Sequence, residues 1–285
     1  MNKLSSIDPD YVEWNKIELP DAWPDQLSFN QFSDLGLFIR KVRGKQIEPV
    51  VLPESLPLNV ELPKYLLQEF HNLPNGNYSK KISRGYVTGF DVSMLGKMKY
   101  ARSKLADDLF SCSSVLDVGS AGGRMTAELA AAGINDVWGL EASPYLLQHA
   151  MNDYPGIKFI QGLAEETGFS SERFDGISAC FLFHEIPPKY AAQALSEFHR
   201  ILKPGGLVSI AEPAPEQMYS SYWEMFKRFG FMGLYFKMLA KRVHEPFVHS
   251  WHKLNYSQWA ADHGFELLQD KSSMPVRFIV LKRQA

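Results

Sequence analysis

The chain has 285 residues, of which 45% are hydrophobic and 22% charged, with a formal net charge of −2. This composition predicts a globular protein with a sizeable core, and the lack of any run of five or six basic residues argues against nucleic acid as a partner. The two cysteines, Cys112 and Cys180, form no disulfide framework, and residues 1–14 contain no apolar stretch typical of a signal peptide. We therefore expect a cytoplasmic protein.

Residues 1–80 have a different sequence pattern from the rest of the chain, because prolines interrupt every apolar run. We expect an N-terminal extension or cap with only short strands or turns, for example at 35–39 and 50–52. From Tyr86 to Leu109 the apolar residues recur at helical spacing, which predicts a helix that leads into the core.

From Val115 onward strands and helices are expected to alternate, which favours a parallel α/β sheet covered on both faces. Ser143 and Pro144 are typical of a helix start, as is Pro187-Pro188. The expected strands are 115–118, 136–141, 158–160, 174–179 and 207–211, the helices are 124–132, 145–152 and one after Pro188, and 203–206 is expected to form a turn.

The segment 218–238 breaks this alternation. It is dense in large apolar side chains, yet Glu224, Lys227, Arg228 and Lys237 exclude a membrane-spanning helix. We expect a helix pair, either packed on the core or serving as a lid insertion at about 214–250. A helix at 256–263 and strands at 265–268 and 276–281 should complete the chain.

The stretch Val115–Met125 (VLDVGSAGGRM) predicts a strand, a tight turn of small residues and a helix. The turn lets a ligand approach the backbone closely, and the helix start offers free N–H donors. Glu141, at the end of the next strand, could accept hydrogen bonds from both hydroxyls of a ribose. The alternatives are a helix-capping or turn acid for Asp117 and a solvated loop acid for Glu141.

Four ordered motifs resemble those of the class I S-adenosylmethionine-dependent methyltransferases: 115–123, Glu141, Phe174-Asp175 and 202–206. The chain is most similar to the branch with the ubiquinone and menaquinone C-methyltransferases, which carry a methyltransferase type 11 domain. The resemblance implies a Rossmann-like seven-stranded, mostly parallel sheet over 81–285 with helices on both faces and an antiparallel last strand beside the fifth. It also implies S-adenosylmethionine as the cofactor. Ala121 stands where the family pattern has a glycine.

The resemblance also implies site residues. Asp117 and Gly119 would lie by the methionine part of the cofactor, and Glu141 would bind the ribose. Tyr86 is expected to close over the methionine end. The other expected cofactor residues are Ser120, Ala121 and Gly123 in the loop, Ala142, Ala164 and Glu165 around the adenine, and Cys180 and Phe181 below the sulfonium.

Methyl transfer needs an acceptor held in line and, for a hydroxyl, thiol or carbon acid, the loss of a proton. His184, with Glu185 beside it, is the candidate base or acceptor-orienting group, and the alternative is a structural histidine that pins the following helix. His244 is a candidate on the acceptor side. No metal site is predicted, because His244, His249 and His252 lack a metal-ligand spacing and Pro246 interrupts them.

The expected function is methyl transfer to a small, apolar or aromatic acceptor at oxygen, carbon or sulfur, without stable membrane insertion. A small-thiol S-methyltransferase, a non-catalytic S-adenosylmethionine-binding interaction protein and an NAD-dependent oxidoreductase are the alternatives. The last would require Gly-x-Gly-x-x-Gly, whereas residues 119–124 read GSAGGR. The oligomeric state stays open, with a homodimer as one option.

Overall fold

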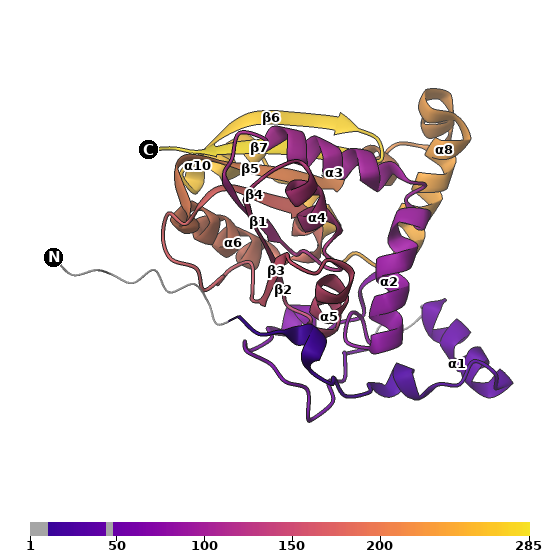
Figure 1. Cartoon of the computed structure of the whole chain (residues 1–285). Coiled ribbons are helices and arrows are strands. Elements are labelled where there is room, and N and C mark those ends of the chain that lie inside the picture. Colours follow the sequence, from indigo (N-terminus) through magenta and orange to yellow (C-terminus); the bar gives the residue numbers. More distant parts are fainter. Residues whose placement is uncertain (1–10, 44–47) are drawn as a thin grey trace.

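A seven-stranded sheet in the order β3-β2-β1-β4-β5-β7-β6 forms the centre of the computed structural model, which describes residues 11–43 and 48–285 (Figure 1). Six strands are parallel, and β7 runs antiparallel between β5 and β6. The predicted sheet is therefore confirmed. The expected lack of a signal peptide concerns residues 1–14, of which 1–10 lie outside the described residues. The strands are β1 (Ser114–Val118), β2 (Asp136–Glu141), β3 (Lys158–Gln161), β4 (Phe174–Cys180), β5 (Leu202–Pro213), β6 (Phe265–Ser273) and β7 (Val276–Arg283).

Helices cover both faces of this sheet. β1 is buried throughout, so its alternate side chains feed two separate cores: Val115 packs with α3, α4 and α8, and Leu116 packs with α6, α9 and α10. The helices are α1 (Phe32–Val42), α2 (Lys80–Ser93), α3 (Lys97–Asp108), α4 (Arg124–Ala131), α5 (Pro144–Asp153), α6 (Pro188–Ile201), α7 (Glu216–Tyr219), α8 (Tyr222–Arg242), α9 (Val248–His252) and α10 (Tyr256–Asp262).

Four local expectations are wrong. The helix expected from Tyr86 to Leu109 is two helices, α2 and α3, because Leu95 and Gly96 adopt positive φ between them. Residues 35–39 lie in α1, and residues 50–52 form no strand beyond the neighbouring Pro49–Gln68 bridge. The turn expected at 203–206 is a bulge in β5, where pairing with β4 jumps from Leu202 to Leu207.

The N-terminal segment packs against α5. The Trp14 side chain is 1% exposed in a core that also contains Tyr145 and Leu147 of α5. The Tyr145 hydroxyl donates a hydrogen bond to the Pro20 carbonyl at 2.8 Å, and the Gln148 amide donates to the Ile17 carbonyl at 2.8 Å. This segment is therefore attached to the sheet domain by both apolar and polar contacts.

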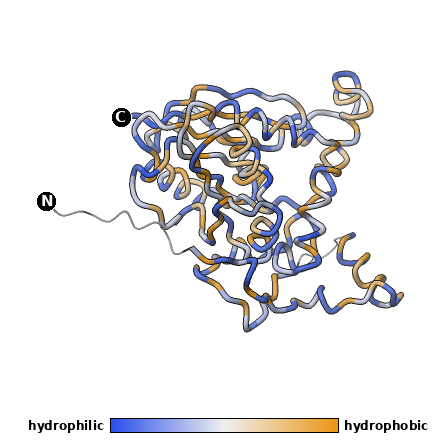
Figure 2. The backbone as a smooth tube through the Cα atoms, viewed as in Figure 1, coloured by the Kyte–Doolittle hydropathy of each residue, from blue (hydrophilic) through white to orange (hydrophobic). Residues whose placement is uncertain are grey.

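Most of the segment 218–238, which is rich in large apolar side chains, lies in α8. This helix breaks at Gly230 (φ 61°, ψ −148°), so the expected helix pair is two consecutive helical segments. The Tyr235 hydroxyl donates to the Ser93 carbonyl at 2.7 Å, which joins α8 to the end of α2. Apolar residues run through the strands in Figure 2 but also mark the projecting α8, where Trp223 and Phe231 are exposed. Across residues 11–43 and 48–285, no helix is long and apolar enough to cross a membrane.

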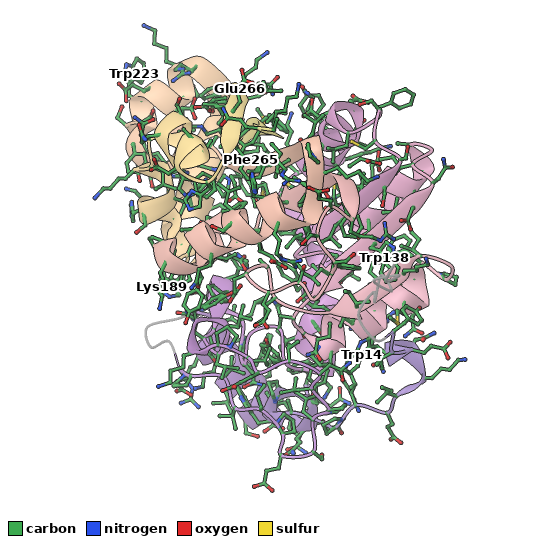
Figure 3. All side chains as sticks on the ribbon, turned by 90° about the vertical axis from the view of Figure 1, so that its left-hand side faces the viewer. Trp14, Trp138, Lys189, Trp223, Phe265 and Glu266 are labelled. Carbon is green, nitrogen blue, oxygen red and sulfur yellow. The ribbon has the colours of Figure 1, made fainter. Side chains whose placement is uncertain are left out.

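Replacing Trp14 by alanine tests whether the N-terminal segment contributes to the stability of the fold. Because Trp14 is buried, we expect the Trp14→Ala change to lower the free energy of unfolding by about 3 kcal/mol. Trp223, which lies at the far end of the molecule from Trp14 in Figure 3 and is 70% exposed, is the matched control. Urea denaturation should show a change within about 0.5 kcal/mol for Trp223→Ala. Equal stabilities of the two variants would contradict this role for Trp14.

Candidate active site

A pocket of about 1280 Å³, measured out to its open mouth, lies at the carboxyl ends of β1, β2 and β4. In open parallel sheets this edge is where ligands bind, because the loops that leave the strands diverge there. Of the residues that the sequence predicted, those that line the pocket are Tyr86, Gly119, Ser120, Ala121, Glu141, Ala142, Ala164, Cys180, Phe181 and Glu185.

Glu141, the last residue of β2, ties two loops together. Its Oε2 accepts a hydrogen bond from the Ala121 N–H and its Oε1 accepts one from the Ser143 N–H, each at 2.9 Å. Burial raises the pKa of Glu141 to about 7, although these backbone donors favour the charged form. Each carboxylate oxygen has a further lone pair, so Glu141 can still accept hydroxyl donors from the pocket.

The loop after β1 has an unusual backbone at Ala121, which adopts φ 45°. This conformation is unfavourable for a residue with a Cβ, yet it lets the Ala121 N–H reach Glu141. Phe181, at the end of β4, also has a positive φ of 60°. Two strained residues of different loops therefore face the same pocket.

Asp117 lies behind the pocket wall. Its two carboxylate oxygens accept hydrogen bonds from the hydroxyls of Ser178 on β4, at 2.6 Å, and Thr126 on α4, at 2.7 Å. Burial raises the pKa of Asp117 to about 6, and the two hydroxyl donors oppose the rise. In this structure Asp117 links β1 to its neighbours, and its contact with a ligand stays a prediction.

Aromatic rings form the opposite wall of the pocket. Tyr86 and Phe90 of α2 pack side by side with ring centroids 5.5 Å apart, and Phe90 meets the edge of Phe181 at 5.7 Å. The N-terminal segment completes this wall, although its irregular backbone offered no periodic signal in the sequence. The wall residues it contributes are Tyr65, Leu66, Phe70, Asn77 and Tyr78.

A charged group that the sequence did not reveal also lines the pocket. Asp91 of α2 accepts two hydrogen bonds from the Arg102 guanidinium, at 2.9 and 2.7 Å, and its Oδ2 lies 2.6 Å from Arg124 Nη1. Burial opposes ionisation of Asp91, but both arginines outweigh this and lower its pKa. The site thus holds one carboxylate between two guanidinium groups.

His184 is fully buried and does not line the pocket. Its Nδ1 lies 2.6 Å from Oε2 of Glu212, a buried residue near the end of β5. Burial disfavours the charged imidazole, but Glu212 and then Glu245 outweigh it and raise the pKa of His184 to about 9. Because His184 lies behind the pocket lining and is held by Glu212, its geometry is that of a positioning residue, and its role as a base stays a prediction.

Glu185 is the residue of this pair that faces the pocket. Its Oε1 lies 3.0 Å from His71 Nε2 and 3.8 Å from His184 Nε2. Burial opposes ionisation, but His71 and then His184 lower the pKa of Glu185. Glu185 is therefore an ionised carboxylate at neutral pH. His71, which the sequence did not single out, stacks on Tyr86 with ring centroids 5.8 Å apart.

The remaining predicted residues lie outside the pocket lining. Gly123 starts α4 beneath Phe159, and Glu165 accepts the Tyr65 hydroxyl at 3.0 Å in a second cavity. His244 contributes its carbonyl to the His71 N–H at 3.1 Å. His249 and His252 instead bond Tyr219 and the Pro213 carbonyl, so the three histidines of this run make separate local contacts.

Replacing Glu212 by glutamine tests the buried pair with His184. The change leaves a buried imidazolium without its counter-ion, so we expect a loss of about 3 kcal/mol of unfolding free energy near pH 7. Because the folded-state pKa of His184 is raised, the stabilisation is complete below its unfolded pKa, near 6.5, and is lost as pH rises through about 9. Urea denaturation should show the difference between wild type and Glu212→Gln shrinking over that range.

The matched control is Glu266→Gln on β6, an exposed position labelled in Figure 3. Its effect should stay within about 0.5 kcal/mol at every pH. A difference between wild type and Glu212→Gln that does not change with pH would contradict the assignment of the stabilisation to the His184 charge.

Part of the chain around this pocket is similar to known proteins. A model of the methyltransferase domain matches residues 115–206, which span β1 to the start of β5. An uncharacterised methyltransferase of Synechocystis is 38% identical over 98 residues, covering 34% of this chain and 46% of the relative. A demethylmenaquinone methyltransferase of Chlorobaculum tepidum is 38% identical over 99 residues, covering 35% and 40%. The chain thus spans less than half the length of these curated relatives.

The fold has solved counterparts as well. An S-adenosylmethionine-dependent methyltransferase structure from Thermotoga maritima aligns with a TM-score of 0.50 at 17% identity, covering 72% of this chain and 97% of that one. At this identity the likeness shows the fold alone. The matched residues contain the strand-end loop and Glu141, both of which line the pocket. Residues 115–206 are thus similar to a methyltransferase domain, and the seven-stranded sheet has the fold of S-adenosylmethionine-dependent methyltransferases.

Proposed function

We propose that the protein transfers a methyl group from S-adenosylmethionine to a small acceptor with an aromatic or apolar frame and a hydroxyl, thiol or acidic carbon. One observation carries this proposal: a single pocket is lined at one side by Glu141 and the β1 loop and at the other by aromatic rings and Glu185. The first side suits a nucleoside, and the second suits a flat apolar molecule with one polar group.

The residues present fit the cofactor. Glu141 would accept the ribose hydroxyls with its remaining lone pairs, while Ala142 and Ala164 leave room for the adenine. Arg102 and Arg124 would bind the carboxylate of the methionine part, and Asp91 would hold its ammonium group. The family match does not reach Asp91 or Arg102, so these roles are inferred from their place in the pocket alone.

When bound, S-adenosylmethionine supplies a methyl group on a sulfonium, an electrophile that needs no covalent activation by the protein. The work of the chain is then to position the acceptor and keep the pocket dry. Cys180, the last residue of β4, and Phe181 after it line the pocket and would lie below the sulfonium. Burial raises the pKa of the Cys180 thiol, so it remains protonated and does not compete as a nucleophile.

Glu185 is the group that we propose contacts the acceptor. As an ionised carboxylate in an aromatic wall, it would accept the hydrogen bond of the acceptor hydroxyl or thiol, which orients a lone pair of the acceptor oxygen or sulfur toward the methyl carbon. His71 and His184 would hold Glu185 in place from behind. His184 thus becomes a positioning residue in this proposal, and Glu185 takes the acceptor-facing role.

Glu141→Gln tests the cofactor side of the pocket. The glutamine amide would turn an N–H₂ group toward a backbone N–H donor, so both the loop and the ribose contact should suffer. We expect S-adenosylhomocysteine to bind at least about tenfold more weakly, because charged hydrogen bonds contribute about 1.5–3 kcal/mol each. Isothermal titration calorimetry measures this, with Glu166→Gln, outside the pocket, as the control. Equal affinity of Glu141→Gln and wild type would contradict the assignment.

A labelling experiment tests the acceptor side. The full chain is incubated with S-adenosylmethionine carrying an isotopically labelled methyl group and a bacterial cell extract that contains small molecules, protein and nucleic acid. We expect label in one apolar compound that organic solvent extracts, and less of it with Glu185→Gln. Tight binding of S-adenosylhomocysteine without any labelled product would indicate a binding protein instead, and label in protein or nucleic acid would contradict the small-molecule acceptor.

A further inference from the structure

Four ionisable side chains from three separate segments meet beside the aromatic wall of the pocket. His71 comes from the short turn Phe70–Asn72, His184 and Glu185 from the turn Phe183–Glu185 after β4, and Glu245 from the loop after α8. These side chains are at most 20% exposed, and that of His184 is fully buried. Segments separated by 60 or more residues thus converge on one small volume.

The donor atoms of these side chains face one another. His71 Nε2 lies 3.0 Å from Glu185 Oε1 and 3.8 Å from Glu245 Oε1. His184 Nε2 lies 3.8 Å from Glu185 Oε1 and 3.7 Å from Glu245 Oε1. Ligands about 2.0–2.1 Å from a tetrahedral metal ion are about 3.4 Å apart, so the observed separations bracket that value. Donor atoms of His71, His184 and Glu185 all lie within 4.8 Å of one another.

A second observation concerns His184 alone. Its Nδ1 contacts Glu212 at 2.6 Å, so in the neutral imidazole that a metal ion would bind, the proton would lie on Nδ1 and Nε2 would be the ligand atom facing the cluster. That Nε2 atom is buried and has no hydrogen-bond partner among the described residues. A carboxylate that fixes the far nitrogen of a buried histidine is the usual second-shell arrangement around a metal-binding imidazole.

The position of the carboxylates also suits a cation. Those of Glu185, Glu212 and Glu245 lie close to the two imidazoles in a largely buried region. A buried carboxylate is unfavourable unless a positive group or hydrogen-bond donors surround it, and a divalent cation held by the cluster would supply such a positive group.

We propose that His71, His184, Glu185 and Glu245 form a binding site for a divalent transition-metal ion of the zinc type. Imidazole nitrogens with carboxylate oxygens suit Zn²⁺ or Co²⁺ better than Ca²⁺ or Mg²⁺, which prefer oxygen ligands. The sequence did not predict this site. In residues 244–252 the histidines are the residues that suggest a metal site, whereas the ligand that we propose in this run is Glu245. His71 stood alone in an irregular segment.

The location suggests what the ion would bind, and this step rests on the proposed function. Glu185 and Tyr86, which stacks on His71, both line the pocket, so an added ligand position would open toward the acceptor. An acceptor oxygen or sulfur bound there would lose its proton to water at the pocket mouth, because coordination lowers its pKa. Its lone pair would then form the bond to the methyl carbon as the C–S bond electrons pass to sulfur, giving S-adenosylhomocysteine.

The test is a Co²⁺ titration of the full chain after dialysis against a chelator, followed by the visible absorption of tetrahedral Co²⁺. We expect one equivalent to bind. Glu245→Gln and His71→Ala should each weaken binding at least about tenfold, and the outer-sphere change Glu212→Gln should weaken it about 10–100-fold. His249→Ala, in the same histidine run but bonded to Tyr219, is the control and should bind as wild type does.

Two readouts keep the outcomes distinct. Circular dichroism of each variant in chelator shows whether it folds. If His71→Ala does not fold, the test rests on Glu245→Gln, which keeps the shape of the side chain. Co²⁺ binding that is absent, or unchanged in Glu245→Gln, would overturn the metal site. Calorimetry with S-adenosylhomocysteine on the same sample separates this failure from failure of the proposed function, because the cofactor side of the pocket does not depend on the metal.

Discussion

Burial of carboxylates at one edge of the sheet is the constraint on which this structure depends. Asp117, Glu141 and Glu212 each stand at the last or next-to-last residue of a strand, in β1, β2 and β5. A buried carboxylate is unfavourable unless donors surround it, so each of the three recruits hydroxyl, backbone N–H or imidazole donors from neighbouring segments. The requirement to satisfy these acids thus fixes the loops that form the pocket.

Each acid has a different effect on the site. Asp117 joins β1 to β4 and α4, and Glu141 holds Ala121 in its positive-φ conformation. Glu212 accepts the N–H groups of Leu182 and Phe183 as well as His184 Nδ1, which holds the loop that presents Glu185 to the pocket. The proposed cofactor side and the proposed acceptor side of the pocket therefore both depend on a buried carboxylate at a strand end, with different donors around it.

The sequence predicted the sheet well because its strands are buried runs with regular spacing, and motif residues such as Glu141 follow directly from the strand ends. It failed where structure depends on distant contacts. Arg102 and Asp91 are surface-like charges in a helical pattern until folding brings them to Arg124. His71 lies in a segment without periodicity, and Glu212 lies inside an apolar strand. The sequence therefore did not predict that His71 contacts Glu185 or that Glu212 contacts His184. The break between α2 and α3 at Gly96 could not be predicted either, because the spacing of apolar residues does not reveal the backbone conformation.

The most direct test of the central claim, that this pocket binds S-adenosylmethionine through Glu141, is a crystal structure of the full chain with S-adenosylhomocysteine. It should show the ribose hydroxyls on Glu141, the amino acid end between Asp91 and the two arginines, and the sulfur facing Phe181. A nucleoside bound elsewhere, or bound in this pocket with its ribose away from Glu141, would contradict the account.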